Sequence, residues 1–347
     1  MARVRDHSIW LFAFGYFAAY VPYSALTKAV SSGKLGGAPV SGVELLPISG
    51  MASLAGMFVF ITAMRWWKYA SSFELAGLRL PRPTRYTLLS GICTAGVIAT
   101  TTLAYTFDGV SIVFMMLLMR GGVLILAPIV DGLGGRKVRW FSTVGLVLSI
   151  NALLVAFLEE KDGGFNLTYV ALADVALYLG AYFVRLRFMT KLAKSEDTAE
   201  RTRYFVEEQM VATPVLVALL AIGALIGEGA FMMDLRAGFT TFFDRPVVLE
   251  GILIGVFSQF TGIFGGLVLL DKRENSYSVP VNRCASVLAG VVASYVLMRW
   301  LGGGGPSTHE LMGAFLIMQA ILFLTLPVLL ASRTRVTAPA TPPPQAP

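Results

Sequence analysis

Two arginines interrupt long apolar stretches of the sequence. Arg120 lies near the middle of the stretch from Val110 to Asp131, and Arg283 lies within Tyr277 to Met298. An arginine at the centre of a bilayer costs roughly 2.5 to 3.5 kcal/mol on insertion scales, so the Arg120 side chain must face protein or water. A guanidinium binds carboxylate and phosphate through two parallel hydrogen bonds. The two arginines therefore predict a site for an anion, and together they suit a doubly charged head group.

Each arginine also has a structural interpretation. Arg120 is too far from either interface to reach water, at a helical rise of about 1.5 Å per residue. Its alternative role is a buried ion pair, for instance with Asp174 or Glu208. Arg283 lies closer to the cytoplasmic end of its stretch, where a long side chain can extend to the interface. Substrate binding and a structural role therefore both remain open.

Further polar residues on apolar stretches complete the candidate site. We expect the substrate-binding set to include, besides the two arginines, Tyr20, Lys28, Tyr105, Gln259 and Asn282. Lys28 lies near the outer end of its stretch, where an interfacial lysine is the simpler interpretation. Asp174 and Glu208 are candidates for coupling or gating, and Glu208 is expected at the cytoplasmic mouth. None of these sites calls for a metal or a cofactor.

The composition is that of a helical membrane protein. Hydrophobic residues make up 56% of the 347 residues and charged residues 14%. Apolar segments of about 20 residues match the thickness of a bilayer core. Ten such segments are predicted as transmembrane helices, at about 9–30, 43–64, 86–107, 110–130, 140–158, 168–188, 204–227, 247–270, 279–298 and 310–331.

The net charge of +7 follows the membrane sides and does not indicate nucleic-acid binding. With the N-terminus inside, Lys and Arg favour the cytoplasmic loops by about four to one, counting 185–203 as a cytoplasmic segment. Both termini are therefore predicted to be cytoplasmic. The apolar run after the N-terminal basic residues is too long for the core of a cleaved signal peptide, so it is expected to remain as the first helix.

The sequence contains signs of an internal repeat. Ala19-Tyr20 in the first segment matches Ala181-Tyr182 in the sixth, and Arg120 in the fourth matches Arg283 in the ninth. The offset of five segments predicts an all-α integral membrane fold built as a 5 + 5 inverted repeat, with the site where the repeats meet. The repeats are expected at 1–162 and 163–331, followed by a disordered Pro-rich tail at 332–347.

A resemblance to a known superfamily rests on the repeat and on one sequence unit, LAYTFDGVSIVFMMLLMRGGVLILAPIVD. In this unit a short turn at Asp108-Gly109 joins two segments. Over residues 1 to about 331 the chain resembles the drug/metabolite transporter superfamily, which includes EamA-type exporters, triose-phosphate translocators and nucleotide-sugar transporters. The resemblance implies a cavity surrounded by segments one to four and six to nine. Segments five and ten would stand outside, where they can mediate a homodimer. Phosphate-carrying members use basic cavity residues, and Arg120 and Arg283 are the positions that match.

The sequence gives no support to an enzyme. It has no paired-aspartate metal motif, no His/Cys cluster and no nucleotide-binding loop, and neither His7 nor His309 falls within an apolar segment. We therefore expect a secondary active transporter of a small organic anion or phosphorylated metabolite, working by alternating access in a bacterial-type inner membrane. Its partners would be lipids and substrate. Two alternatives are a flippase for a polyprenyl-phosphate type lipid, and a non-transporting membrane scaffold in which the arginines are only paired.

The charge distribution makes a testable prediction about topology. A reporter fused within 190–203 or after residue 333 should read cytoplasmic, because these segments carry clustered basic residues. A fusion within 228–245 should read external. An external reading at 190–203 would show that the predicted number of helices is wrong.

Overall fold

The computed structural model describes residues 8–35, 38–75, 78–107, 110, 112–133, 140–158, 169–192, 197–271, 275–302 and 305–337. Three predictions fall wholly or partly outside these residues. They are the turn at Asp108-Gly109, the junction between the two repeats near residue 162, and the part of the expected tail beyond Thr337.

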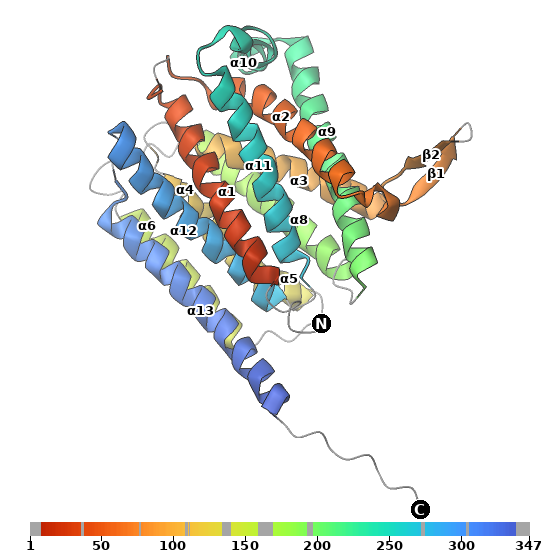
Figure 1. The fold of residues 1–347 in the computed structure, drawn as a ribbon. Helices are drawn as coiled ribbons and strands as arrows, with labels where there is room; N and C mark the ends of the chain where they lie inside the picture. The colour runs from red at the N-terminus through yellow and green to blue at the C-terminus, as the bar shows by residue number, and fades with distance from the viewer. Residues whose placement is uncertain are drawn as a thin grey trace, which may run out of the picture.

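Nearly all of the described chain is helical (Figure 1). The long helices are α1 (Ser8–Ser31), α2 (Gly42–Ala63), α3 (Arg85–Ala104), α6 (Trp140–Leu158), α8 (Tyr169–Leu192), α9 (Thr198–Ile226), α11 (Val248–Leu269), α12 (Asn275–Leu301) and α13 (Thr308–Thr337). The shorter ones are α4 (Ile112–Met116), η2 (Leu117–Gly121), α5 (Gly122–Leu133) and α10 (Gly229–Phe239). Polar caps begin several of them: Ser41, Thr84 and Asp197 each accept a hydrogen bond from a backbone N–H of the first turn.

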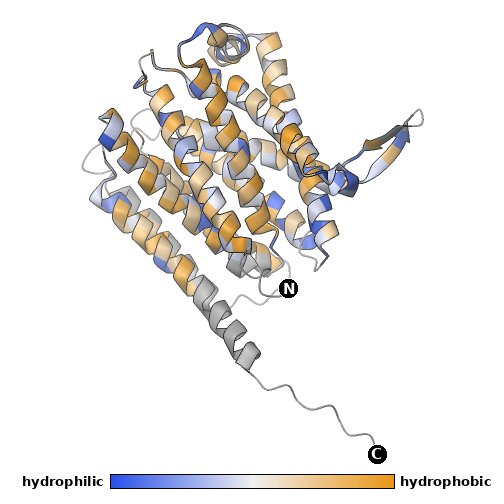
Figure 2. Ribbon diagram, viewed as in Figure 1, coloured by the Kyte–Doolittle hydropathy of each residue, from blue (hydrophilic) through white to orange (hydrophobic). Residues whose placement is uncertain are grey.

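Among the described residues, seven helices are long and apolar enough to cross a membrane: α1, α2, α3, α8, α9, α11 and α12. Many large apolar side chains on their outer faces are exposed, with Leu225 reaching 80%. Such a surface suits lipid contact, because soluble monomers rarely expose large apolar patches. Figure 2 shows the hydrophobic colour along the helices and hydrophilic residues near their ends. The chain is a multi-pass helical membrane protein.

Several elements differ from the sequence expectation. The segment predicted as one helix at 110–130 is divided into α4, η2 and α5, and η2 is a π-helical turn that contains Arg120. Helix α9 begins at Thr198, earlier than predicted, because Asp197 caps it. Helix α13 continues to Thr337, so the expected disordered tail starts too early. Residues Ser72–Leu75 and Leu78–Pro81 form an antiparallel hairpin, β1–β2, that the sequence did not indicate.

Packing arranges the helices in a central group and an outer pair. Helix α1 packs against α11 and α12, and α3 packs against α8 and α9. Helices α6 and α13 pack on each other, with α12 and α5 beside them, at one edge of the bundle (Figure 1). This is the peripheral position expected for the fifth and tenth segments.

Buried carboxylates of α9 and α2 bind neighbouring segments of the chain. Glu207 in α9 accepts hydrogen bonds from the backbone N–H groups of Ser71 and Thr84, which flank the hairpin. Glu44 in the first turn of α2 binds Arg245 through two bonds of 2.7 and 2.9 Å. These contacts hold the hairpin to α9 and the segment after α10 to α2.

The close approach of α2 and α11 depends on Gly255. A Cβ at this position would lie 2.2 Å from the backbone oxygen of Ser49 and 2.6 Å from Cβ of Ala52. A Cβ on Gly262, in the same helix, would meet nothing within 4 Å. Small residues at such contacts let helices in a membrane pack closely.

Replacing Gly255 with Ala should therefore destabilise the protein by roughly 1–3 kcal/mol, because the two helices must separate. The matched control, Gly262→Ala, should leave the melting temperature unchanged or slightly raised, since Ala favours helix over Gly. Equal melting temperatures for the two variants in the same detergent would show that this helix contact is not tight.

Candidate functional site

A cavity of about 70 Å³ with several polar residues in its wall lies inside the bundle. Its walls come from α1, α3, η2, α8, α9, α11 and α12. Its polar lining consists of Tyr16, Tyr20, Tyr23, Thr94, Thr101, Arg120, Tyr182, Arg185, Gln209, Ser258, Gln259, Thr261 and Asn282. Ligand pockets for small molecules have volumes of about 300–1,000 Å³, so the walls of this cavity must move apart before it can enclose a metabolite.

Arg120 lies in the wall of this cavity. It belongs to the π-helical turn η2, a local irregularity that is frequent at functional sites. Its Nη1 donates to the hydroxyl of Tyr178 and its Nη2 donates to the hydroxyl of Tyr20. The guanidinium carbon is 5.3 Å from the ring centroid of each tyrosine. Two neutral tyrosines therefore hold the cation by hydrogen bonds and by attraction to their rings.

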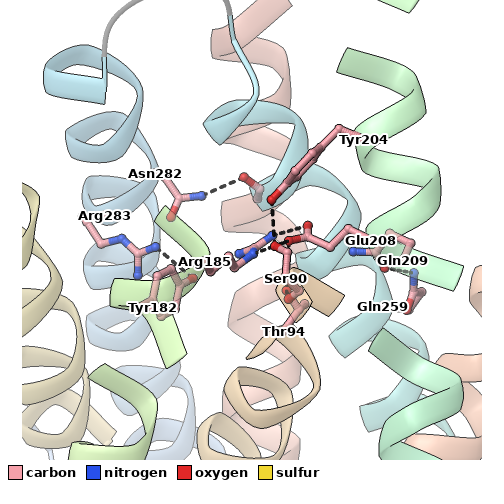
Figure 3. A network of polar contacts seen from close by, with 11 residues as sticks. Ser90, Thr94, Tyr182, Arg185, Tyr204, Glu208, Gln209, Gln259, Asn282 and Arg283 are labelled. Carbon is pink, nitrogen blue, oxygen red and sulfur yellow. Dashed lines mark hydrogen bonds and ion pairs between the residues drawn. The ribbon is translucent and has the colours of Figure 1, made fainter. Parts of the chain in front are cut away.

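Arg283 occupies an equivalent arrangement from α12. Its Nη1 donates to Tyr178 at 3.2 Å. Its Nη2 donates to Tyr182 at 3.0 Å (Figure 3). The side chain is 0% exposed and lies behind Tyr182, whose ring centroid is 4.8 Å from the guanidinium carbon. Tyr178 accepts from both arginines and so joins them. Arg120 reaches the cavity itself, whereas Arg283 reaches it through Tyr182.

Neither Arg120 nor Arg283 forms an ion pair with a carboxylate in the described part of the chain. The Nε atoms of both are buried and have no hydrogen-bond partner there. Uncompensated buried charge is costly in a medium of low polarity. The site therefore carries positive charge that an anion would stabilise.

Glu208 pairs with a different arginine. It accepts bonds of 2.8 Å from both Nε and Nη2 of Arg185, and it also accepts from Ser90 and Thr94 (Figure 3). Arg185 was expected in a cytoplasmic loop. That prediction is wrong, because Arg185 is buried within α8. Glu208 is likewise buried and does not lie in an open mouth.

The remaining predicted residues divide into those at the cavity and those outside its lining. Gln259 and Asn282 line the cavity, and Tyr105 lies behind it, where its hydroxyl is 2.7 Å from that of Tyr20. Lys28 and Asp174 are not in the lining. Lys28 Nζ donates to the backbone oxygens of Phe107 and Val110, so it holds the connection between α3 and α4. Asp174 is buried in α8, and its Oδ2 has no hydrogen-bond partner in the described residues.

Sequence analysis did not assign a site role to Tyr16, Tyr178, Tyr182 or Arg185. A signal for the tyrosines was present, since both α1 and α8 contain two tyrosines four residues apart: Tyr16 with Tyr20, and Tyr178 with Tyr182. Residues at this spacing share one face of a helix. Under the predicted repeat, the contact of Arg120 with Tyr20 corresponds to that of Arg283 with Tyr182.

The chemistry available to the site is binding by hydrogen bonds and charge. Guanidinium, hydroxyl and amide groups converge on the cavity. No group of three His, Cys, Asp or Glu residues in the described chain could hold a metal ion. Guanidinium, hydroxyl and amide groups can all donate hydrogen bonds to a polar anion.

Breaking the buried pair of Arg185 and Glu208 should destabilise the protein. Glu208→Ala should lower stability by about 3–5 kcal/mol, because it leaves the Arg185 cation buried without a partner. Replacing both residues, as Arg185→Met with Glu208→Leu, should recover most of that loss. The exposed Glu200 of the same helix offers a control, and Glu200→Ala should leave the melting temperature unchanged.

No family model and no curated protein matches the chain. A solved structure described only as "Crystal structure of protein" is similar to it with a TM-score of 0.51 and 14% sequence identity. The likeness covers 94% of this chain and 98% of the other. At this identity the likeness concerns the fold alone, so the chain shares an overall fold with that protein along almost its whole length.

Proposed function

We propose that the protein is a secondary active transporter of a small organic anion or phosphorylated metabolite. The observation that carries this proposal is the pair Arg120 and Arg283, which are buried, joined through Tyr178 and free of ion pairs in the described chain. A guanidinium is a good ligand for carboxylate and phosphate. Arg120 meets the cavity directly, where such a group would bind.

The charge balance of the site supports an anionic substrate. Three guanidinium groups, of Arg120, Arg185 and Arg283, lie around the cavity, and the ion pair of Glu208 in the described chain is with Arg185. A purely structural role for Arg120 was expected to involve Asp174 or Glu208. Glu208 is occupied, and no ion pair joins Arg120 to Asp174. Binding an anion would compensate the remaining positive charge.

Features of the backbone support alternating access. Pro22 lies between Tyr20 and Tyr23 in α1, and Pro280 lies one turn before Arg283 in α12. Each proline removes a helical hydrogen bond and permits a bend. The π-helical turn that contains Arg120 is a third irregularity close to the arginines. Broken helices around a central site are typical of transporters that alternate between two open states.

The wider assignment follows from the same features. We infer ten membrane spans in a 5 + 5 inverted repeat, membership of the drug/metabolite transporter superfamily, and residence in a bacterial-type inner membrane with both termini cytoplasmic. The matching contacts of Arg120 with Tyr20 and of Arg283 with Tyr182 support the repeat. The outer pair of α6 and α13 offers a surface for a homodimer.

Substitution of Arg120 tests the proposal. Arg120→Lys should strongly reduce uptake into proteoliposomes, because lysine keeps the charge but cannot form the two parallel hydrogen bonds of a guanidinium. Arg120→Ala should abolish uptake while the protein stays folded, since its partners are neutral tyrosines. The uptake panel comprises inorganic phosphate, glycerol phosphate and dicarboxylates. A thermal-shift screen of the wild type selects among them, because an anion at 100 times its Kd adds about 2.7 kcal/mol to stability.

Arg187, an exposed arginine of α8, provides the matched control. Arg187→Ala and Arg187→Lys should leave uptake and melting temperature unchanged. Normal uptake by Arg120→Ala for every anion that the wild type carries would exclude Arg120 as a substrate ligand. A collapse in melting temperature for Arg120→Ala would favour the scaffold interpretation.

A further inference from the structure

Asn282 has an unused hydrogen-bond acceptor in the cavity wall. The residue is 1% exposed and lines the cavity from α12. Its Nδ2 donates to the backbone oxygen of Gly265 at 3.2 Å (Figure 3). Its Oδ1 is buried and has no donor among the described residues. A buried polar atom without a partner is costly, so one that lines a cavity points to a ligand that supplies the missing partner.

The orientation of the Asn282 amide is determined by its neighbour. The two ends of an amide side chain are distinguished by their hydrogen bonds. Gly265 presents a carbonyl oxygen, which can only accept, so the NH₂ end must face it. The oxygen end is therefore the free one, and the ligand group beside it must be a hydrogen-bond donor.

Arg120, in the wall of the same cavity, lacks a hydrogen-bond acceptor for its Nε within the described chain, whereas Asn282 lacks a donor for its Oδ1. A continuous wall links the two residues: a Cβ on Gly265 would touch both Nδ2 of Asn282 and the ring of Tyr16. The Tyr16 and Tyr20 ring centroids are 5.2 Å apart, and the Tyr20 hydroxyl binds Arg120. Asn282 and Arg120 therefore lie in the lining of the same cavity.

We propose that the substrate is a hydroxylated anion whose hydroxyl group donates to Oδ1 of Asn282 while its carboxylate or phosphate binds Arg120. This inference rests on the proposed anion site and adds a specificity-determining residue to it. A hydroxyl is favoured over an ammonium group as the donor, because three arginines and one glutamate already make the surroundings positive. An added cation would be repelled.

Matched ligands test the inference on the wild-type protein. Malate, succinate and aspartate share two carboxylates and differ at one position, which carries a hydroxyl, a hydrogen or an ammonium group. 2-Hydroxypropyl phosphate and propyl phosphate form the corresponding phosphate pair, because they differ by one hydroxyl group. We expect the hydroxylated member of the preferred set to bind about 10- to 100-fold more tightly than its deoxy partner, because the deoxy ligand leaves Oδ1 unpaired. Aspartate should bind more weakly than malate.

Asn282→Leu assigns the preference to this residue. The variant should bind hydroxylated and deoxy ligands within about twofold of each other, since no buried acceptor remains to be satisfied. Thr213→Val is the matched control, because it also removes a buried oxygen without a partner in the described chain, but outside the cavity lining. Thr213→Val should keep the wild-type preference. If Asn282→Leu does not fold, the wild-type comparison decides alone.

The outcomes separate the two proposals. Equal binding of hydroxylated and deoxy anions by the wild type would overturn the role of Asn282 and leave the anion transporter intact. Tighter binding of aspartate than of malate would overturn the choice of hydroxyl. Absence of binding by every dicarboxylate and phosphate in the panel would overturn the anion site itself, and this inference with it.

Discussion

The structure depends on how guanidinium groups are accommodated inside an apolar helical bundle. A charge in such surroundings must be paired, hydrogen-bonded or hydrated. Around Arg120 and Arg283 the protein uses tyrosines, whose hydroxyls accept hydrogen bonds and whose rings attract cations without cancelling the charge. The helices that supply these tyrosines, α1 and α8, are thereby fixed to the helices that carry the arginines.

The three arginines of the site have two kinds of hydrogen-bond partner. Arg185 is neutralised by Glu208, whose carboxylate is further satisfied by Ser90 and Thr94, so this network is complete without a ligand. Arg120 and Arg283 receive only neutral partners among the described residues. A paired cation contributes to holding helices together, whereas an unpaired cation is available to a mobile anion. Under the proposed function, the same residue type has a structural role on one side of the cavity and a binding role on the other.

Irregular backbone is concentrated near the site. Arg120 lies in a π-helical turn, and prolines interrupt α1 and α12 close to the residues that contact the two arginines. The outer pair, α6 and α13, contributes no residue to the cavity lining but packs directly against the π-helical turn η2. A π-helical turn and prolines beside the arginines suit a site whose walls can rearrange.

The sequence by itself determined the helical membrane class and the approximate positions of most helices, because hydrophobic length is a local signal. It also placed Arg120, Arg283, Gln259 and Asn282 within apolar segments, where a polar group must face protein or water. Tertiary structure alone decided the partners. Arg185 is buried within α8 and pairs with Glu208 of α9, a contact between two helices that neither segment shows by itself. Spacing along one chain shows which residues share a helix face, but packing between helices decides which faces meet.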